Sequence, residues 1–209
     1  MVSSCFITKY YTIFPMIKSK TEYENKKFSN YTLDNRKILS SIFINCKFTD
    51  SSLVDTTFEK CTFENCIFKD CNLTVIKFPE TSLVECEFFS SKLSGIDWSQ
   101  ARSELGLEVL AKNCDLSYST FFLNDISNSK FIECKFHETT FEKVKMLSAS
   151  FGKCDFTKAR FQNCTMDKAD LSSSYNFYFD PSQNSCKKLK MSRSEALNLL
   201  NAFGIEYSN

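Results

Sequence analysis

Glycine and proline are scarce in this chain of 209 residues, which contains only four glycines and three prolines. Antiparallel strands joined by tight hairpins depend on these residue types, because their turns need positive φ angles or a fixed φ. The composition therefore argues against a hairpin-rich β fold. The chain is long enough for one domain with a sizeable core. With 43% hydrophobic and 24% charged residues, it is too polar for a membrane protein.

An excess of either charge is also lacking, since the formal net charge is +1. This balance indicates neither a polyanion-binding protein nor a strongly acidic one. By region, residues 1–27 carry five Lys against two Glu, whereas residues 28–98 carry seven basic and ten acidic side chains. The first half of the chain after residue 27 is thus mildly acidic.

The N-terminal segment MVSSCFITKYYTIFPMI is apolar, but Lys9 interrupts it and no small-x-small cleavage site follows. We therefore expect a cytoplasmic protein with no membrane segment. The alternative is that this segment is a disordered or misassigned start and that the working chain begins near Met16.

Phenylalanine, by contrast, is abundant, with 22 residues, and large apolar residues recur at every fifth position. The first series comprises Phe28, Leu33, Ile38, Phe43, Phe48, Leu53, Phe58, Phe63, Phe68, Leu73, Phe78, Leu83, Phe88, Leu93 and Trp98. A second series, shifted in phase, comprises Leu116, Phe121, Ile126, Phe131, Phe136, Phe141, Met146, Phe151, Phe156, Phe161, Met166 and Leu171. Neither a helix nor an ordinary strand has a period of five, so the chain must turn every five residues.

A small residue lies two positions before most of the large ones, and nine of the eleven cysteines are found there. They are Cys46, Cys61, Cys66, Cys71, Cys86, Cys114, Cys134, Cys154 and Cys164. Serine, threonine and alanine fill most of the equivalent positions elsewhere. The cysteines are therefore interpreted as small core residues and free thiols, which fits a reducing compartment.

Tandem motifs such as CTFEN, CIFKD, CEFFS, ARFQN and ADLSS resemble the pentapeptide-repeat proteins over residues 28–98 and 114–173. The resemblance implies an all-β solenoid, a right-handed quadrilateral β-helix in which each repeat forms one side and four repeats form one coil. Residues 20 apart should then stack in ladders. The series Leu33, Leu53, Leu73 and the series Phe48, Phe68, Phe88 satisfy this test. Twenty-seven repeats predict nearly seven coils and a rod roughly 30 Å long.

Residues 99–113 form an irregular insertion between the two blocks, because 18 residues separate Trp98 from Leu116. Because 18 is three more than a multiple of five, the irregular part is 3, 8 or 13 residues long. The cysteine ladders favour 8, which would align Cys114 with Cys46 and Cys86. The insertion is either a tolerated surface bulge or a contact loop, and its apolar residues favour contact with the rod or with a partner.

The remaining segments flank the repeats: residues 1–27 are an N-terminal extension and cap, and residues 174–209 are a C-terminal segment. A helix is expected near residues 193–203, with Ser192 and Glu195 as a capping box or Ser194 as the N-cap, and Gly204 as the C′ residue. This helix either only caps the rod or also forms a homodimer. The candidates for dimerisation are Leu197, Leu199, Leu200, Phe203 and Ile205.

Catalytic chemistry is not indicated. The single histidine, His137, is at an outward repeat position, where we expect a solvated side chain with no nucleophile or carboxylate pair gathered around it. Cysteines five apart point inward from different sides, so proximity in sequence does not give a zinc site. We expect no enzyme activity, no metal and no cofactor.

The tail LNLLNAFGIEYSN, the GIDW segment and the overall length resemble the quinolone-resistance and microcin-immunity proteins within this family. The resemblance implies a dimeric rod that binds DNA gyrase or topoisomerase IV, partly as a DNA mimic, and protects it from a drug or toxin without itself binding nucleic acid. The candidates for partner binding are Asp50, Asp55, Glu59, Glu64, Asp70, Glu85 and Glu87 on the faces, with Glu104, Leu105, Leu107, Glu108 and Leu110 in the insertion.

The near-neutral charge departs from a full-length DNA mimic and favours binding through the insertion over binding through charge. A second hypothesis is a scaffolding solenoid that binds another protein through outward apolar residues. These are Val54, Ile67, Val84, Phe89, Phe122 and Ile132. Their contiguity on one side would favour the scaffold, and an acidic stripe would favour the topoisomerase partner.

Overall fold

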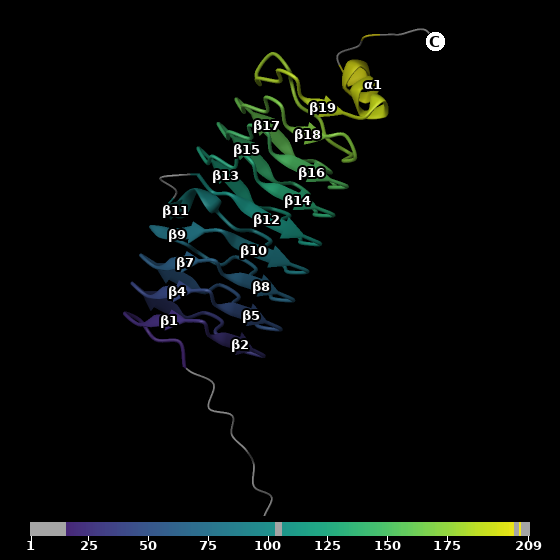
Figure 1. The fold of residues 1–209 in the computed structure, drawn as a ribbon. Coiled ribbons are helices and arrows are strands. Elements are labelled where there is room, and N and C mark those ends of the chain that lie inside the picture. The colour runs from purple at the N-terminus through teal and green to yellow at the C-terminus, as the bar shows by residue number, and fades with distance from the viewer. Residues whose placement is uncertain (1–15, 103–105, 203–204, 206–209) are drawn as a thin grey trace, which may run out of the picture.

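The computed structural model describes residues 16–102, 106–202 and 205. The chain forms a parallel β-solenoid of about eight turns that ends in helix α1 (Arg193–Ala202). The coils are stacked as tiers from β1 and β2 at one end of the rod to β19 and α1 at the other (Figure 1).

The solenoid has four sides, which we number in chain order within a coil. Side 1 contains β1 (Glu22–Glu24), β4 (Ile42–Ile44), β7 (Thr62–Glu64), β9 (Thr81–Val84) and β11 (Ala101–Arg102). Side 2 contains β2 (Lys27–Ser29), β5 (Lys47–Thr49), β8 (Ile67–Lys69), β10 (Cys86–Phe89), β12 (Val109–Lys112), β14 (Lys130–Ile132), β16 (Ser150–Gly152), β18 (Asp170–Leu171) and β19 (Lys190–Met191).

The other two sides are less regular. Side 3 is a column of single bridges that starts with Thr32, Ser52 and Asn72 and continues to Tyr175. Side 4 contains β3 (Lys37–Leu39), β6 (Thr57–Glu59), the 3₁₀ turn η1 (Trp98–Gln100), β13 (Thr120–Phe122), β15 (Thr140–Glu142) and β17 (Arg160–Gln162).

A spacing of twenty residues between neighbouring strands produces the four sides, as the five-residue repeat predicts. Phe28 pairs with Phe48, and Phe48 with Phe68, in parallel register on side 2. Their side chains are buried, whereas the residues on either side of them face outward. The predicted solenoid and its ladders are therefore confirmed.

Stacked rings form much of the core. The ring centroids of Phe43 and Phe63 are 4.6 Å apart and those of Phe48 and Phe68 are 4.7 Å apart, with nearly parallel planes. Each such pair contributes about 0.5–1.5 kcal/mol beyond the burial of its surface. The 22 phenylalanines are thus explained by the ladders.

The corners explain the scarcity of glycine. Among the described residues, twenty-nine that are not glycine have φ between 48° and 62°, at intervals of five for most of the rod. This left-handed conformation costs about 1–2 kcal/mol for most residues and less for Asn and Asp, which occupy many of the corners. Corner N–H groups donate to the next coil, as from Asn45 to the Glu64 carbonyl at 2.9 Å. These bonds offset the backbone cost without glycine.

The small inward residues are interchangeable because cysteine, serine and threonine make the same hydrogen bond. The Cys66 thiol donates to the Phe43 carbonyl at 3.4 Å, and the Thr81 hydroxyl donates to the Phe58 carbonyl at 2.7 Å. All ten cysteines in the described residues are free thiols. Burial raises the pKa of the Cys86 thiol to about 12. This thiol is therefore protonated and unreactive at neutral pH.

The insertion adds three residues, and the favoured value of eight is wrong. Ala101 pairs with Thr81 at the regular spacing of twenty, but Val109 pairs with Cys86 at a spacing of 23. Cys114 consequently follows Ser91 and Cys71 in its column rather than Cys86, as the hydrogen bond from Asp115 to the Ser91 carbonyl shows. The column of cysteines misled the sequence interpretation because serine is an equivalent donor there.

Both ends of the solenoid extend beyond the periodic blocks. Strand β1 lies within the predicted extension 1–27, and the Tyr23 ring stacks on Phe43 with centroids 5.0 Å apart. At the other end, Phe177 and Phe179 remain buried and β19 adds a last strand to side 2. Coiling therefore begins before Phe28 and continues after Leu171.

Helix α1 matches the predicted position. The Ser192 hydroxyl accepts a hydrogen bond from the Glu195 N–H at 3.2 Å, so Ser192 rather than Ser194 is the N-cap. At the other end, the Ile205 N–H donates to the Leu200 carbonyl, which is the bond of a Schellman motif. Gly204, the predicted C′ residue, lies outside the described residues. No helix in the described part of the chain is long and apolar enough to cross a membrane.

Candidate functional site

The seven acidic candidates of the regular faces are distributed over all four sides of the rod. They lie on side 1 and its corner with side 2 (Glu64, Glu85), on side 2 (Glu87), at the corner of sides 2 and 3 (Asp50, Asp70), at the corner of sides 3 and 4 (Asp55) and on side 4 (Glu59). Consequently, they do not form one continuous acidic stripe.

Three of these carboxylates also have cationic partners. Lys77 Nζ lies 2.6 Å from Asp55 Oδ1, and Lys37 Nζ lies 2.7 Å from Glu59 Oε2. The hydrogen bond from Lys37 lowers the pKa of Glu59. Lys69 Nζ is 3.8 Å from Asp70. Pairing of this kind reduces the negative field that a DNA mimic would need.

Four other candidates come together in one pocket of about 500 Å³ at the corner of sides 1 and 2. Glu85 and Glu87 come from the last regular coil of the first block, and Glu108 and Leu110 come from the insertion. The remaining lining residues are Asn65, Ile67, Cys86, Val109, Asn128 and Lys130. Of these additional residues, Asn65, Asn128 and Lys130 are polar groups that the sequence interpretation missed.

The three-residue offset accounts for the position of the pocket. Elsewhere a residue such as Asn65 or Glu85 turns this corner with a φ near 50°. At the insertion, Gly106 adopts φ 93°, and a Cβ atom there would lie 3.2 Å from the Asp125 carbonyl oxygen. Strands β10 and β12, which flank the pocket, are both one residue longer than most others. The corner column is therefore interrupted where the pocket opens.

The pocket carries three carboxylates and one ammonium group. Within the described residues, Glu85, Glu87 and Glu108 form no salt bridge and accept no side-chain hydrogen bond. Glu85 and Glu108 are exposed, while Ile67 and Leu110 are half-buried. The lining thus combines negative charge with aliphatic surface.

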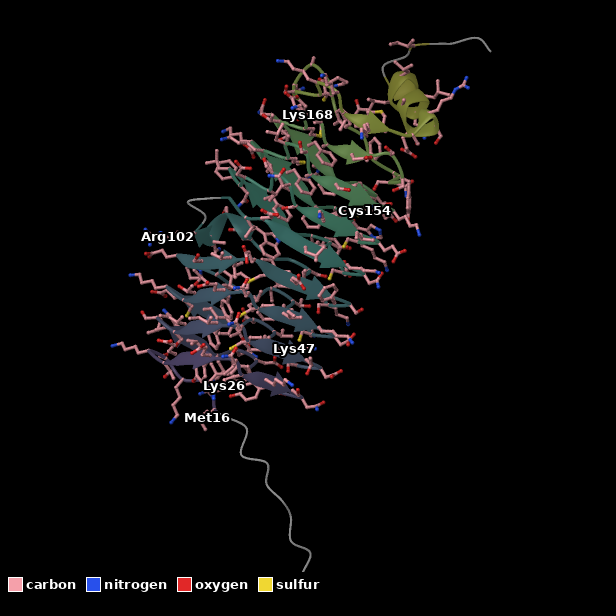
Figure 2. The ribbon with its side chains drawn as sticks, in the orientation of Figure 1. Met16, Lys26, Lys47, Arg102, Cys154 and Lys168 are labelled. Atoms are coloured by element: carbon pink, nitrogen blue, oxygen red, sulfur yellow. The ribbon has the colours of Figure 1, made fainter. Side chains whose placement is uncertain are left out.

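The outer face of side 1 continues the same character. Its outward residues on β1, β4, β7 and β9 are Glu22, Glu24, Ile42, Ile44, Thr62, Glu64, Ser82 and Val84. None of these is basic, and Ile42 and Val84 are 39% and 43% exposed. Arg102 on β11 lies at the edge of the rod where this face ends (Figure 2).

Other candidates in the insertion and the helix have different environments. Leu107 is only 1% exposed and belongs to the core, so it offers no contact surface. Glu104, Leu105 and Phe203 lie outside the described residues. On α1, Leu199 is buried and Leu197 half-buried, whereas Leu200 and Ile205 are exposed.

His137 is half-buried and contacts one carboxylate, so it is not the simply solvated side chain that the sequence predicts. His137 Nε2 lies 2.9 Å from Asp155 Oδ2, one coil away on side 3. Asp155 Oδ1 also accepts hydrogen bonds from Thr157 and Asn176. Burial raises the pKa of Asp155, but the hydrogen bonds from Thr157, Asn176 and His137 outweigh it and lower the pKa to about 2. Within the described residues, no cluster of His, Cys, Asp and Glu is arranged to hold a metal ion.

Comparison with known proteins identifies the repeat. A family model described as a pentapeptide repeat region matches residues 41–121, and a model for nine copies of the pentapeptide repeat matches residues 126–174. No curated protein matches the chain.

Two solved structures have a similar fold. HetL of the cyanobacterium Nostoc, a pentapeptide repeat protein involved in heterocyst differentiation regulation, has a TM-score of 0.50 and 14% identity over 80% of this chain and 88% of its own. Full-length QnrB1, a plasmid-mediated fluoroquinolone resistance protein, has a TM-score of 0.51 and 19% identity over 88% of this chain and 100% of its own. At these identities the likeness is one of fold.

Proposed function

The chain belongs to the pentapeptide-repeat family, and from that premise we propose a non-catalytic protein that binds a type II topoisomerase and protects it from a drug or toxin. The partner is DNA gyrase or topoisomerase IV. The protein acts through its surface, as solenoids of stacked repeats generally do.

The pocket at the interrupted corner is the observation that carries this proposal. It gathers Glu85, Glu87, Glu108 and Leu110 where the two blocks change phase. The regular faces of the rod present similar surfaces in every coil. A partner that binds at one position along the axis therefore needs a feature that occurs in one coil only. The acidic residues scattered over the other sides support at most a local mimicry of DNA, centred on the pocket.

The fold likeness to QnrB1 extends over the whole of that chain and supplies the class of partner. QnrB1 is a fluoroquinolone resistance protein, and drugs of that class act on type II topoisomerases. A topoisomerase partner also places the protein in the cytoplasm, together with the chromosome. The free thiols of the described residues fit that compartment.

We further propose a homodimer formed through the C-terminal end. Leu199 anchors α1 on the solenoid, while Leu200 and Ile205 remain exposed beyond it. An apolar patch at one end of a rod favours a twofold contact between two copies, which doubles the length of the rod. Analytical ultracentrifugation of the wild type and of Leu200→Glu tests this arrangement, because the variant should sediment as a monomer.

A supercoiling assay tests the proposed partner. Purified gyrase and topoisomerase IV are assayed with increasing amounts of the protein, with and without a fluoroquinolone or a peptide toxin. We expect retained topoisomerase activity in the presence of the poison, and direct binding in a pull-down with purified enzyme. Absence of inhibition, of protection and of binding for both enzymes contradicts the proposal.

A scaffolding role is the second candidate, and one observation favours it. Of the six outward apolar residues considered, Ile67, Phe89 and Ile132 lie on side 2, close to Leu110. Val54, Val84 and Phe122 are on other sides. The involvement of HetL in heterocyst differentiation regulation is consistent with such a use of this fold. Binding of a protein other than a topoisomerase that Phe89→Lys abolishes would support this candidate.

A further inference from the structure

The pocket at the corner of sides 1 and 2 has two kinds of lining. Ile67, Val109 and Leu110 supply aliphatic surface, and the carboxylates of Glu85, Glu87 and Glu108 supply negative charge. Lys130 is the one cation among the lining residues. Long basic side chains have the complementary structure, since an apolar stem carries a charged head group.

The register places the carboxylates close together. Cys86 pairs with Val109, so the preceding residues, Glu85 and Glu108, occupy neighbouring coils on the same corner. Neighbouring coils are about 4.8 Å apart. Glu87 is on the adjacent outward position of β10, paired with Leu110. Like charges at such positions repel one another, and a cation bound between them relieves the repulsion.

We propose that this pocket receives an arginine or lysine side chain of the protein partner. The inference rests on the proposed function and specifies the chemistry of its contact. A protein is favoured over a free polyamine because side 1 adjoins this corner and offers further surface in the exposed Ile42 and Val84 and the carboxylate of Glu64, with Arg102 on β11 at its end. A small amine would leave that surface unused.

The first experiment measures binding to purified gyrase holoenzyme. The double variant Glu85→Gln/Glu108→Gln removes two charges from the pocket with little change of shape. The control, Glu80→Gln/Glu138→Gln, removes two charges from other corners, where Lys60 and Lys158 are the partners; both residues have the left-handed backbone of Glu85. We expect at least tenfold weaker binding for the pocket variant, about 1.4 kcal/mol, and a change below about twofold for the control.

The second experiment uses a probe that does not depend on gyrase. A capped tripeptide, acetyl-Leu-Arg-Leu-amide, is titrated into the isotope-labelled protein while amide resonances are followed by NMR. We expect shifts centred on Glu85, Glu108, Leu110 and Lys130. The citrulline analogue, which has the same shape without the charge, should leave these resonances unchanged. Spermidine is titrated in parallel.

The outcomes separate the two proposals. If wild type and pocket variant bind gyrase equally, the pocket inference is wrong and the proposed function stands. If the wild type binds neither topoisomerase, the proposed function fails and the peptide titration alone decides the inference. Equal shifts with the citrulline peptide, or stronger shifts with spermidine than with the arginine peptide, overturn the assignment of a protein side chain.

Discussion

The block before the interruption and the block after it differ in which sides carry rings and which form sheets. On side 1, the first block buries Tyr23, Phe43 and Phe63, whereas the second block buries Ile126 and Met146. Side 1 is a sheet in the first block and a column of isolated bridges in the second. The flat surface of side 1 therefore ends at the interruption, next to the pocket.

Side 4 shows the opposite change. After the interruption it becomes the three-stranded sheet β13–β15–β17, and the Trp98 ring stacks on Phe121 with centroids 5.6 Å apart to continue the ladder. Ala111 interrupts the ring ladder of side 2 in the same region, between Phe88 and Phe131. A three-residue offset thus changes the sides without breaking the core.

Removal of a stacked ring should show the largest difference between the blocks. Phe63→Ala is expected to cost about 4 kcal/mol and Met146→Ala about 3 kcal/mol, because only Phe63 loses a ring contact as well as buried surface. Urea denaturation measures both values. Equal losses would mean that stacking on side 1 adds nothing to the first block.

Asp155 in the second block should contribute a pH dependence that Asn72, in the same column of side 3 in the first block, cannot contribute. Asn72 in the first block makes the same hydrogen bonds to Thr74 that Asp155 makes to Thr157. Because the folded-state pKa of Asp155 is lowered from 3.8 to about 2, its stabilisation is complete above the ordinary value and is lost as pH falls through the folded value.

We therefore expect the free energy of unfolding of the wild type to fall between pH 4 and pH 2 by about 2 kcal/mol more than that of Asp155→Asn. Denaturation curves at several pH values measure the difference. Parallel curves for the two proteins over this range contradict the role of Asp155.

The junction between the blocks should matter for function more than for folding. Deletion of residues 103–105 would restore the regular spacing of twenty residues between β10 and β12. The buried residues Leu107, Val109 and Ala111 would still be present to fill the core. We expect this variant to fold. The concentration at which it gives half-maximal protection of the topoisomerase should rise about tenfold, which corresponds to a loss of about 1.4 kcal/mol in binding free energy.

Replacement of the same three residues by Gly-Ser-Gly keeps the offset and removes their side chains. If this variant protects like the wild type while the deletion does not, the offset itself makes the pocket. Full protection by both variants would show that the junction is only a bulge.

The corners should give the smallest effect. Val75 is a β-branched residue with φ 51°, and Leu123 has φ 58° with an exposed side chain. Replacement of either by Asn, which tolerates this conformation, should stabilise each block by about 1 kcal/mol. Val54→Asn, at an outward position without positive φ, is the control and should bring no gain. Thermal denaturation measures all three.

Most of the fold was predictable because the period of five and the ladders at spacing twenty are local patterns. The N-cap at Ser192 follows from a short motif in the same way. The three-residue offset was not predictable from cysteine positions, since the Cys114 thiol and the Ser91 hydroxyl make equivalent hydrogen bonds to carbonyls of the preceding coil. The pair of His137 and Asp155 was missed because a spacing of 18 joins different positions of two repeats.

The candidate site was predicted only as a set of residue types. Glu85, Glu87, Glu108 and Leu110 belong to two separate lists in the sequence, and the interruption brings them to one corner. Leu107, three residues from Leu110, is taken into the core instead. Which residues of the insertion face inward depends on the strand pairing of β12 with β10, and that pairing is a long-range property.

The sequence by itself determined the solenoid, the inward residues of each repeat and the terminal helix, because each follows from periodicity or from a capping motif within a few residues. Only the tertiary structure decided the register across residues 99–113, the ion pairs that neutralise part of the acidic surface, and the position of the pocket. These depend on which coil lies next to which, and hydrogen bonds between coils set that order.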